Sequence, residues 1–217
     1  MSYKAIIFDL DGTLLDTLQD LAISVNAVLK SYKLAEHPVA AYRYFVGDGI
    51  DVLVQRAFPD GLIDEQGPDV LVAAVKEEYA QHWSDQTKPY PGVAELLNYL
   101  EIKGIPKAIF SNKPHEFALL TVAKLLPDWT FSYVYGISEK TPRKPDPHGA
   151  LLIAEQLSLK TEEIVYLGDT DTDMQTAVSG GFFPVGATWG FRNPEELLTG
   201  GAKKLAARPE DLAELFA

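Results

Sequence analysis

The sequence predicts an α/β protein, with a parallel sheet covered by helices on both faces and an inserted α-helical subdomain. From about residue 93 onward, short apolar runs alternate with amphipathic helical segments, which is typical of right-handed crossovers between parallel strands. Residues 16–85 show helical periodicity instead. Polar clusters directly follow several of the apolar runs, as expected where ligands bind beyond the carboxyl ends of parallel strands.

The length of the chain allows two parts. Its 217 residues, 47% of them hydrophobic, are sufficient for a packed core domain and a smaller second one. We expect residues 1–15 and 86–217 to form the α/β core, and residues 16–85 to form the helical subdomain. The first strand should therefore join the sheet across the insertion.

The first strand, about residues 4–8, leads into an acidic loop. It ends in Asp9 and Asp11, and Gly12 follows. Strand alternation returns Asp11 to the side of Asp9, so two negative charges enter one small volume and favour a cation between them. An acidic turn chosen for its backbone geometry is the alternative when the segment is considered alone.

The helical subdomain follows this loop. Apolar residues recur at spacings of three and four over residues 18–32, then over 50–57, and a third helix is expected from Pro68 to about Trp83. The core is then expected to continue with a helix that ends at Gly104. Four further strands are expected at 107–110, 133–137, 164–167 and 182–185, with helices at 114–126, 147–157 and 172–178.

Three more polar clusters accompany these strands. They are Ser111-Asn112-Lys113, the segment 143–147 that contains Lys144, and Gly168-Asp169-Thr170-Asp171-Thr172-Asp173. Several carboxylates suit a hard divalent cation, and Mg²⁺ fits better than Ca²⁺ because few protein ligands are evident beside an expected phosphate. A hydroxyl, an amide and an ammonium are the groups that phosphoryl oxygens require.

Each cluster has another interpretation when it stands alone. Residues 169–173 could suggest a calcium loop, but Met174 occupies the position where such a loop requires glycine. Ser111 and Asn112 could cap the next helix, and Lys144 could be a solvated lysine in a proline-rich turn. The combination of all four clusters favours one functional site.

Charge and composition exclude several classes of partner. The formal net charge is −12 and the pI is near 4.7, which argues against nucleic acid and anionic membranes as partners. The absence of cysteine excludes disulfides and thiolate metal sites. The apolar run that follows residues 1–4 is too short for a signal peptide, and no stretch of the sequence is suited to span a bilayer. We expect a cytoplasmic protein, a monomer or homodimer, that acts on a small molecule.

In these motifs the sequence resembles the haloacid dehalogenase superfamily of phosphohydrolases. Asp9-Leu10-Asp11-Gly12-Thr13-Leu14 resembles its first motif, Ser111-Asn112 its second, Lys144 its third and residues 168–173 its fourth, in the family's order. The resemblance implies a Rossmann-like core, a helical cap between the first two motifs, and Mg²⁺-dependent phosphoryl transfer through an aspartyl-phosphate. Residues 45–57 and Thr188-Trp189-Gly190 also resemble phosphoglycolate phosphatases.

The resemblance gives each site residue an expected role. Asp9 is expected as the nucleophile and Asp11 as the general acid and base, with Ser111 and Lys144 also in the catalytic set. The substrate-binding set is Gly12, Ser111, Asn112 and Lys144. The metal set is Asp9, Asp11 through its backbone carbonyl, Asp169 and Asp173, where Asp173 orients the metal's surroundings.

Other activities remain open beside a phosphatase for small phosphate monoesters. A phosphosugar mutase of the same superfamily would also use Asp9 and Asp11, but no His or Lys follows Thr17 closely enough to suggest its cap donors. A pyrophosphatase fits the same cap type. A dehalogenase is disfavoured, because it has no use for Asp11 or for a metal site. A non-catalytic phospho-receiver is less favoured, because it needs only a sheet domain and this chain also carries the helical segment 16–85.

Overall fold

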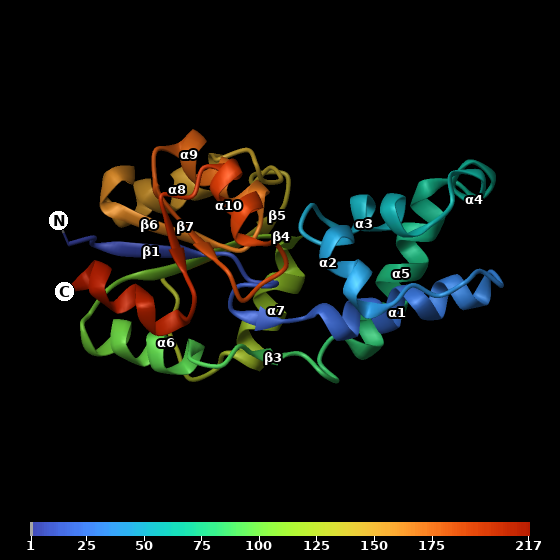
Figure 1. Ribbon diagram of the computed structural model, residues 1–217, viewed down its shortest axis with the longest axis horizontal. Helices are drawn as coiled ribbons and strands as arrows, with labels where there is room; N and C mark the ends of the chain where they lie inside the picture. Colours follow the sequence, from blue (N-terminus) through green and yellow to red (C-terminus); the bar gives the residue numbers. More distant parts are fainter. Residues whose placement is uncertain (1) are drawn as a thin grey trace. The chain divides into compact units, whose positions relative to one another are not determined.

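The computed structural model describes residues 2–217, which divide into two compact units (Figure 1). Unit 1 comprises the described residues up to Leu15 together with Pro89–Ala217. Unit 2 comprises Asp16–Lys88. The chain leaves unit 1 through the two-residue strand β2 (Leu15–Asp16) and returns through β3 (Lys88–Pro89), which pair with each other.

Unit 1 is built on a six-stranded sheet with the order β5-β4-β1-β6-β7-β8. Every neighbouring pair is parallel, so the predicted α/β fold is confirmed. The strands are β1 (Ala5–Phe8), β4 (Lys107–Pro114), β5 (Tyr133–Ile137), β6 (Ile164–Gly168), β7 (Phe183–Ala187) and β8 (Lys204–Ala206).

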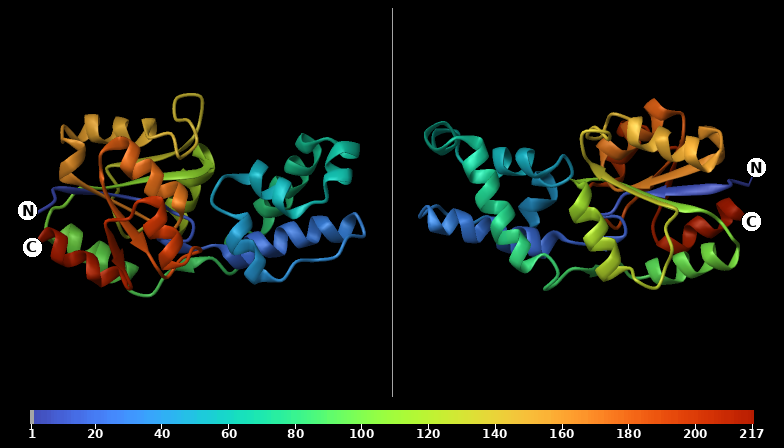
Figure 2. Two further views of the ribbon diagram at one scale, coloured as in Figure 1. Left: turned by 45° about the horizontal axis from the view of Figure 1, so that its top comes forward. Right: turned by 180° about the vertical axis from the view of Figure 1, so that it is seen from behind.

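Helices cover both faces of this sheet, because alternate residues of its central strands are apolar on both sides. Ile6 and Phe8 belong to one buried cluster, and Ala5 and Ile7 belong to another. The first face packs against α6 (Val93–Ile102), α7 (His115–Leu125) and the 3₁₀ helix η3 (Pro209–Phe216). The second packs against α8 (His148–Leu157) and α9 (Asp171–Gly180), with α10 (Pro194–Gly200) beside α9. Figure 2 shows the sheet of unit 1 between these layers.

Unit 2 is helical between the two short strands at its ends. Its helices are α1 (Leu18–Ser31), the 3₁₀ helix η1 (Val39–Ala41), α2 (Tyr42–Phe45), α3 (Ile50–Ala57), α4 (Asp60–Gln66) and α5 (Pro68–His82). Both α1 and α3 pack on α5, where Leu71 and Val75 are fully buried. The apolar stripes seen in the sequence therefore form the interior of this unit.

A buried carboxylate ties the two ends of unit 2 together. Asp20, in the first turn of α1, is 1% exposed. It accepts hydrogen bonds from the backbone N–H groups of Gln86 and Thr87 at 2.9–3.0 Å, and from the Thr87 hydroxyl at 2.7 Å. The segment that leads back to unit 1 is thus fixed to the start of α1.

The structure differs from the sequence-based boundaries at several elements. β4 continues to Pro114 rather than ending at residue 110, because the polar residues 111–113 stay extended and buried. Asp16 lies in the short strand β2, which was not predicted, whereas α1 begins at Leu18, where the apolar periodicity begins. The short elements α4, α10, β8 and η3 were not predicted. Among residues 2–217, no helix is both long and apolar enough to cross a membrane.

Candidate active site

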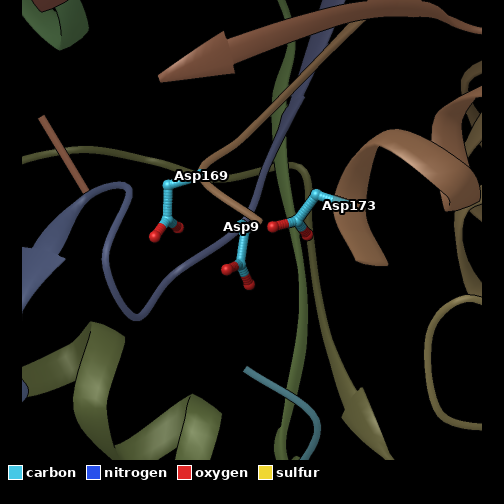
Figure 3. Close-up of side chains that lie close together, drawn as sticks. All are labelled: Asp9, Asp169 and Asp173. Carbon is cyan, nitrogen blue, oxygen red and sulfur yellow. The ribbon is translucent and has the colours of Figure 1, made fainter. Parts of the chain in front are cut away.

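Three aspartates meet at the carboxyl ends of the central strands (Figure 3). Asp9 follows β1, Asp169 follows β6, and Asp173 lies in the first turn of α9. One carboxylate oxygen from each lies within 4.8 Å of the others. Asp169 and Asp173 are fully buried, and Asp9 is 6% exposed. β1 and β6 are neighbours in the sheet, which is why residues so distant in sequence come together.

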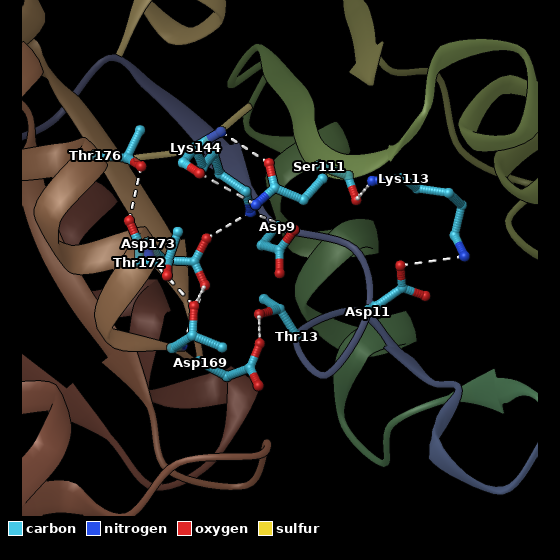
Figure 4. A network of polar contacts seen from close by, with 12 residues as sticks. Asp9, Asp11, Thr13, Ser111, Lys113, Lys144, Asp169, Thr172, Asp173 and Thr176 are labelled. Atoms are coloured by element: carbon cyan, nitrogen blue, oxygen red, sulfur yellow. Dashed lines mark hydrogen bonds and ion pairs between the residues drawn. The ribbon is translucent and has the colours of Figure 1, made fainter. Parts of the chain in front are cut away.

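Lys144 supplies the positive charge in this cluster (Figure 4). It precedes α8, is 2% exposed, and its ammonium donates to Asp9 Oδ1 at 2.7 Å and to Asp173 Oδ1 at 2.6 Å. Three carboxylates and one ammonium leave the ionised cluster with excess negative charge.

The crowding of charges shifts the pKa values of these groups. Burial raises the pKa of Asp9 well above its usual value, and the nearby Asp173 raises it further, against the lowering effect of Lys144. Burial and Asp173 raise the pKa of Asp169 to about 7. Burial alone would lower the pKa of Lys144, but Asp173 and Asp9 outweigh it, so that pKa is raised and the ammonium stays charged.

Asp169 is held from both sides. Its Oδ1 accepts from the Thr13 hydroxyl at 2.7 Å, and its Oδ2 accepts from the backbone N–H of Phe191 at 2.8 Å. Gly12, with φ of +90°, and Gly190 lie so close that a Cβ on either would overlap the Asp169 side chain. Only glycines at these two positions leave room for the carboxylate.

Asp173 is oriented by the start of its own helix. Thr170 and Asp173 form a capping box, in which Asp173 Oδ2 accepts from the backbone N–H of Thr170 at 3.1 Å and from its hydroxyl at 2.7 Å. The other oxygen of Asp173 contacts Lys144. The capping interaction therefore fixes the lysine as well as the helix.

The residues of this cluster fit a hard divalent cation. Carboxylate oxygens are the ligands that Mg²⁺ prefers, and a dication would compensate the surplus negative charge of Asp9, Asp169 and Asp173. The three oxygens are close enough together to serve one ion or its bound waters.

Ser111 and Asn112 lie beside the cluster on β4. Both are buried. The Asn112 side chain exchanges two hydrogen bonds with the backbone of Lys144, accepting from its N–H at 2.8 Å and donating to its carbonyl at 3.4 Å. Ser111 Oγ accepts from the backbone N–H of Lys113 at 3.2 Å. In this structure Asn112 therefore positions the segment that carries Lys144.

Asp11 stands outside the Lys144 network. Its Oδ2 lies 3.2 Å from the ammonium of Lys113, and Figure 4 shows its carboxylate directed toward that lysine. The structure thus brings Asp9, Lys144, Asp169 and Asp173 into one network, places Gly12 against Asp169, and gives Asp11 a different partner.

Two residues of this region had no role in the sequence-based site. Thr13 belongs to the first motif, but its bond to Asp169 spans 156 positions and is not encoded in any local pattern. Lys113 was recognised as part of a polar cluster and given no function. Its position directly after Ser111 and Asn112 at a strand end was the available signal.

Comparisons with known proteins identify relatives of this chain. Residues 6–186 match the sequence profile of the family described as haloacid dehalogenase-like hydrolase. A phosphoglycolate phosphatase of Nitrosospira multiformis is 36% identical over 183 residues, covering 82% of this chain and 80% of the relative. A phosphoglycolate phosphatase of Pseudomonas putida KT2440 is 30% identical over 194 residues, covering 88% of this chain and 71% of the relative.

Solved structures show the same fold along the whole chain. A crystal structure from Lactobacillus delbrueckii subsp. bulgaricus superposes with a TM-score of 0.91 at 29% identity, and covers 100% of this chain and 99% of its own. A predicted phosphoglycolate phosphatase from Haemophilus somnus 129PT gives 0.90 at 26% identity, with the same coverage.

Proposed function

Since this chain belongs to the haloacid dehalogenase-like hydrolases and is a phosphatase of that family, we propose that it hydrolyses a small phosphate monoester through a phosphorylated Asp9. Phosphoglycolate is the first candidate substrate, because the similar proteins from Nitrosospira multiformis and Pseudomonas putida carry that name. The phosphatase class rests on the family, whereas the substrate and the covalent route are our proposal.

The observation that carries the proposal is the surrounding of Asp9. This carboxylate is buried at a strand end and accepts a hydrogen bond from the Lys144 ammonium. It also lies within 4.8 Å of two further carboxylates. A packing role does not require such a concentration of buried charge, which is costly to desolvate. A nucleophile that must approach an anionic phosphate does require adjacent cationic groups.

The reaction proceeds in two displacements. An oxygen of Asp9 forms a bond to phosphorus while the bond from phosphorus to the ester oxygen breaks, and Asp11 donates a proton to that leaving oxygen. Water then attacks the phosphorus, Asp11 accepts its proton, and the bond to Asp9 breaks. Lys144 and Ser111 are assigned to the phosphoryl oxygens, and Asn112 to holding Lys144 and to the substrate.

A magnesium ion fits the acidic side of this site. Asp9, the backbone carbonyl of Asp11 and Asp169 would hold it, and Asp173 would orient its surroundings. When bound, Mg²⁺ supplies positive charge that reduces repulsion between the carboxylate and the phosphate. We assign residues 16–85 the role of a cap that selects the organic part of the substrate.

The test is phosphate release, with Mg²⁺ and with chelator. The panel contains 2-phosphoglycolate, sugar phosphates, nucleotides, pyrophosphate and 4-nitrophenyl phosphate. We expect Mg²⁺-dependent release with 2-phosphoglycolate preferred. Release spread over many esters would remove the specific substrate, a preference for pyrophosphate would favour a pyrophosphatase, and no release from any compound would contradict the proposal.

The covalent route has its own variants. Asp9→Asn is expected to abolish release, whereas Asp128→Asn, which changes an exposed aspartate outside the site, is expected to leave it unchanged. Brief reaction followed by acid quench and mass spectrometry should detect phosphate on Asp9 in the unsubstituted protein. Full turnover in Asp9→Asn would exclude the aspartyl-phosphate.

A further inference from the structure

Lys113 is a buried lysine that the reaction described above leaves without a role. It is 7% exposed near the carboxyl end of β4. Its ammonium lies 3.2 Å from Asp11 Oδ2 and 5.2 Å from the centre of the Phe117 ring. Its backbone N–H donates to Ser111 Oγ. The lysine is therefore anchored at its backbone and at its head group, which limits where Asp11 can point.

The two oxygens of Asp11 differ in their surroundings. Oδ2 faces the Lys113 ammonium. Oδ1 is buried and has no hydrogen-bond partner among residues 2–217. A buried carboxylate oxygen without a donor is costly, and a catalytic role is one of the reasons for which native structures contain such an atom.

We propose that Lys113 is a positioning residue for Asp11, holding Oδ2 so that Oδ1 is presented to the oxygen that leaves the substrate. The inference rests on the proposed function, because it requires Asp11 to be the general acid. The proton moves from Asp11 Oδ1 to the leaving oxygen as the bond to phosphorus breaks. Lys113 neither gives up nor takes a proton; it restricts the rotation of the Asp11 carboxyl group, and an acid misplaced by about 1 Å loses much of its effect.

The leaving group provides the test. An alkyl phosphate needs a proton on its leaving oxygen, whereas 4-nitrophenyl phosphate releases a stable phenolate. The value of kcat/KM covers the steps up to phosphorylation of Asp9 and is independent of the later hydrolysis. In Lys113→Met we expect kcat/KM for 2-phosphoglycolate, or for the best alkyl phosphate of the panel, to fall about 100-fold. For 4-nitrophenyl phosphate we expect a fall of less than about threefold.

Lys107 at the start of the same strand provides a matched control. It is 3% exposed, its ammonium lies 3.3 Å from Glu101 Oε1, and it lies 6.0 Å from the centre of the Phe131 ring. Lys107→Met therefore removes a buried lysine with the same kinds of partner, at the opposite end of β4. We expect it to leave the ratio of the two kcat/KM values unchanged. Lys113→Arg keeps the positive charge, so its ratio of kcat/KM for the alkyl phosphate to kcat/KM for 4-nitrophenyl phosphate should lie between those of Lys113→Met and the unsubstituted protein.

The Asp11→Asn background separates positioning from direct substrate contact. If Lys113 acts through Asp11, adding Lys113→Met to Asp11→Asn changes the ratio no further. An equal loss on both substrates, no loss on either, or a loss that persists in Asp11→Asn would overturn the inference. Thermal unfolding of each variant shows whether it is folded. Absence of Mg²⁺-dependent release in the unsubstituted protein would instead contradict the proposed function.

Discussion

A methyl group is the only difference between glycine and alanine, and residue 190 has no room for one. An added Cβ would overlap Asp169 and the backbone carbonyl of Gly12. Both neighbours belong to the acidic site, and Asp169 is already fixed by Thr13 and by the backbone of Phe191. The position of one carboxylate therefore depends on the absence of a side chain elsewhere.

We expect Gly190→Ala to destabilise unit 1 by about 1–3 kcal/mol, the usual cost of overpacking, and to weaken activation by Mg²⁺. Urea unfolding and Mg²⁺ titration of phosphate release measure the two effects. Gly61→Ala in α4 is the control, because among the described residues no atom outside the adjoining helix backbone lies within 4 Å of the added Cβ. Equal free energies of unfolding for the two variants would contradict this prediction, because they would show that the loop carrying Gly190 can move to accommodate the added methyl group.

The sequence predicted the site residues that have a chemical signature and missed those defined by distant contacts. Asp9 and Asp169 stand in recognisable motifs at strand ends, and Lys144 stands in the proline-rich segment 143–147 before α8. The bond from Thr13 to Asp169 and the pairing of Lys113 with Asp11 depend on how strands separated by many residues align. Side-chain pairing across a sheet is a tertiary property, and local spacing does not contain it.

Among the elements, α6 shows how one helix combines essential and dispensable apolar residues. Leu97 is fully buried in the core of unit 1, whereas Ile102, at the last position of the helix, is 86% exposed. Both look equally hydrophobic in the sequence. Only their position relative to the sheet distinguishes them.

Leu97→Ala is therefore expected to cost about 2–5 kcal/mol of unfolding free energy, and Ile102→Ala less than about 0.5 kcal/mol. Urea denaturation followed by circular dichroism provides both values. A cost at Ile102 comparable to that at Leu97 would mean that the exposed end of α6 is covered by a partner.

Asp20 is the residue of unit 2 for which we predict a similar loss of stability on substitution. Asp20→Ala removes the acceptor of two backbone N–H groups and of the Thr87 hydroxyl, so we expect a loss of about 1–3 kcal/mol or more from the unpaired buried donors. The exposed first-turn aspartate of α5 gives the control, Asp69→Ala, with an expected cost below about 1 kcal/mol. Trp83 fluorescence, in a variant lacking the other two tryptophans, would follow unit 2 selectively. Similar losses would contradict the role of Asp20 as the tie between the ends of the unit.

Elements with a continuous apolar run or a clear apolar stripe were predictable, and most elements without one were not. The strands with continuous apolar runs, such as β6, follow directly from the sequence. β8 has three residues of mixed burial, and α4 has no buried residue. Such segments are ordered by their neighbours in space rather than by their own pattern.

For the molecule as a whole, the site carries an electrostatic cost that depends on protons and metal. Burial raises the pKa of Asp169 from 3.8 to about 7. Between these values the folded state binds a proton that the unfolded state lacks, so stability decreases as pH rises. Added Mg²⁺ should offset the repulsion by binding the ionised form.

We predict that the melting temperature in chelator falls by several degrees between pH 5 and pH 8, and that saturating Mg²⁺ reduces this fall. Differential scanning calorimetry with and without Mg²⁺ measures both. Asp169→Asn is the control, because it removes one of the two carboxyl groups with a raised pKa and should make the fall smaller, while Asp9 retains a raised pKa. A profile identical in all three conditions would argue against Asp169 as the source of the pH dependence.

The spacing of the site along the chain also affects how the enzyme is made. Lys144 and Asp9 are 135 positions apart, and Thr13 and Asp169 are 156 apart. When Asp9 emerges from the ribosomal exit tunnel, its partners Lys144, Asp169 and Asp173 have therefore not yet been translated. Asp9, Lys144, Asp169 and Asp173 are all present only after residue 173 of the 217 has been translated. A chain that ends before Asp169 lacks two of the three carboxylates of the acidic cluster, so we expect it to release no phosphate.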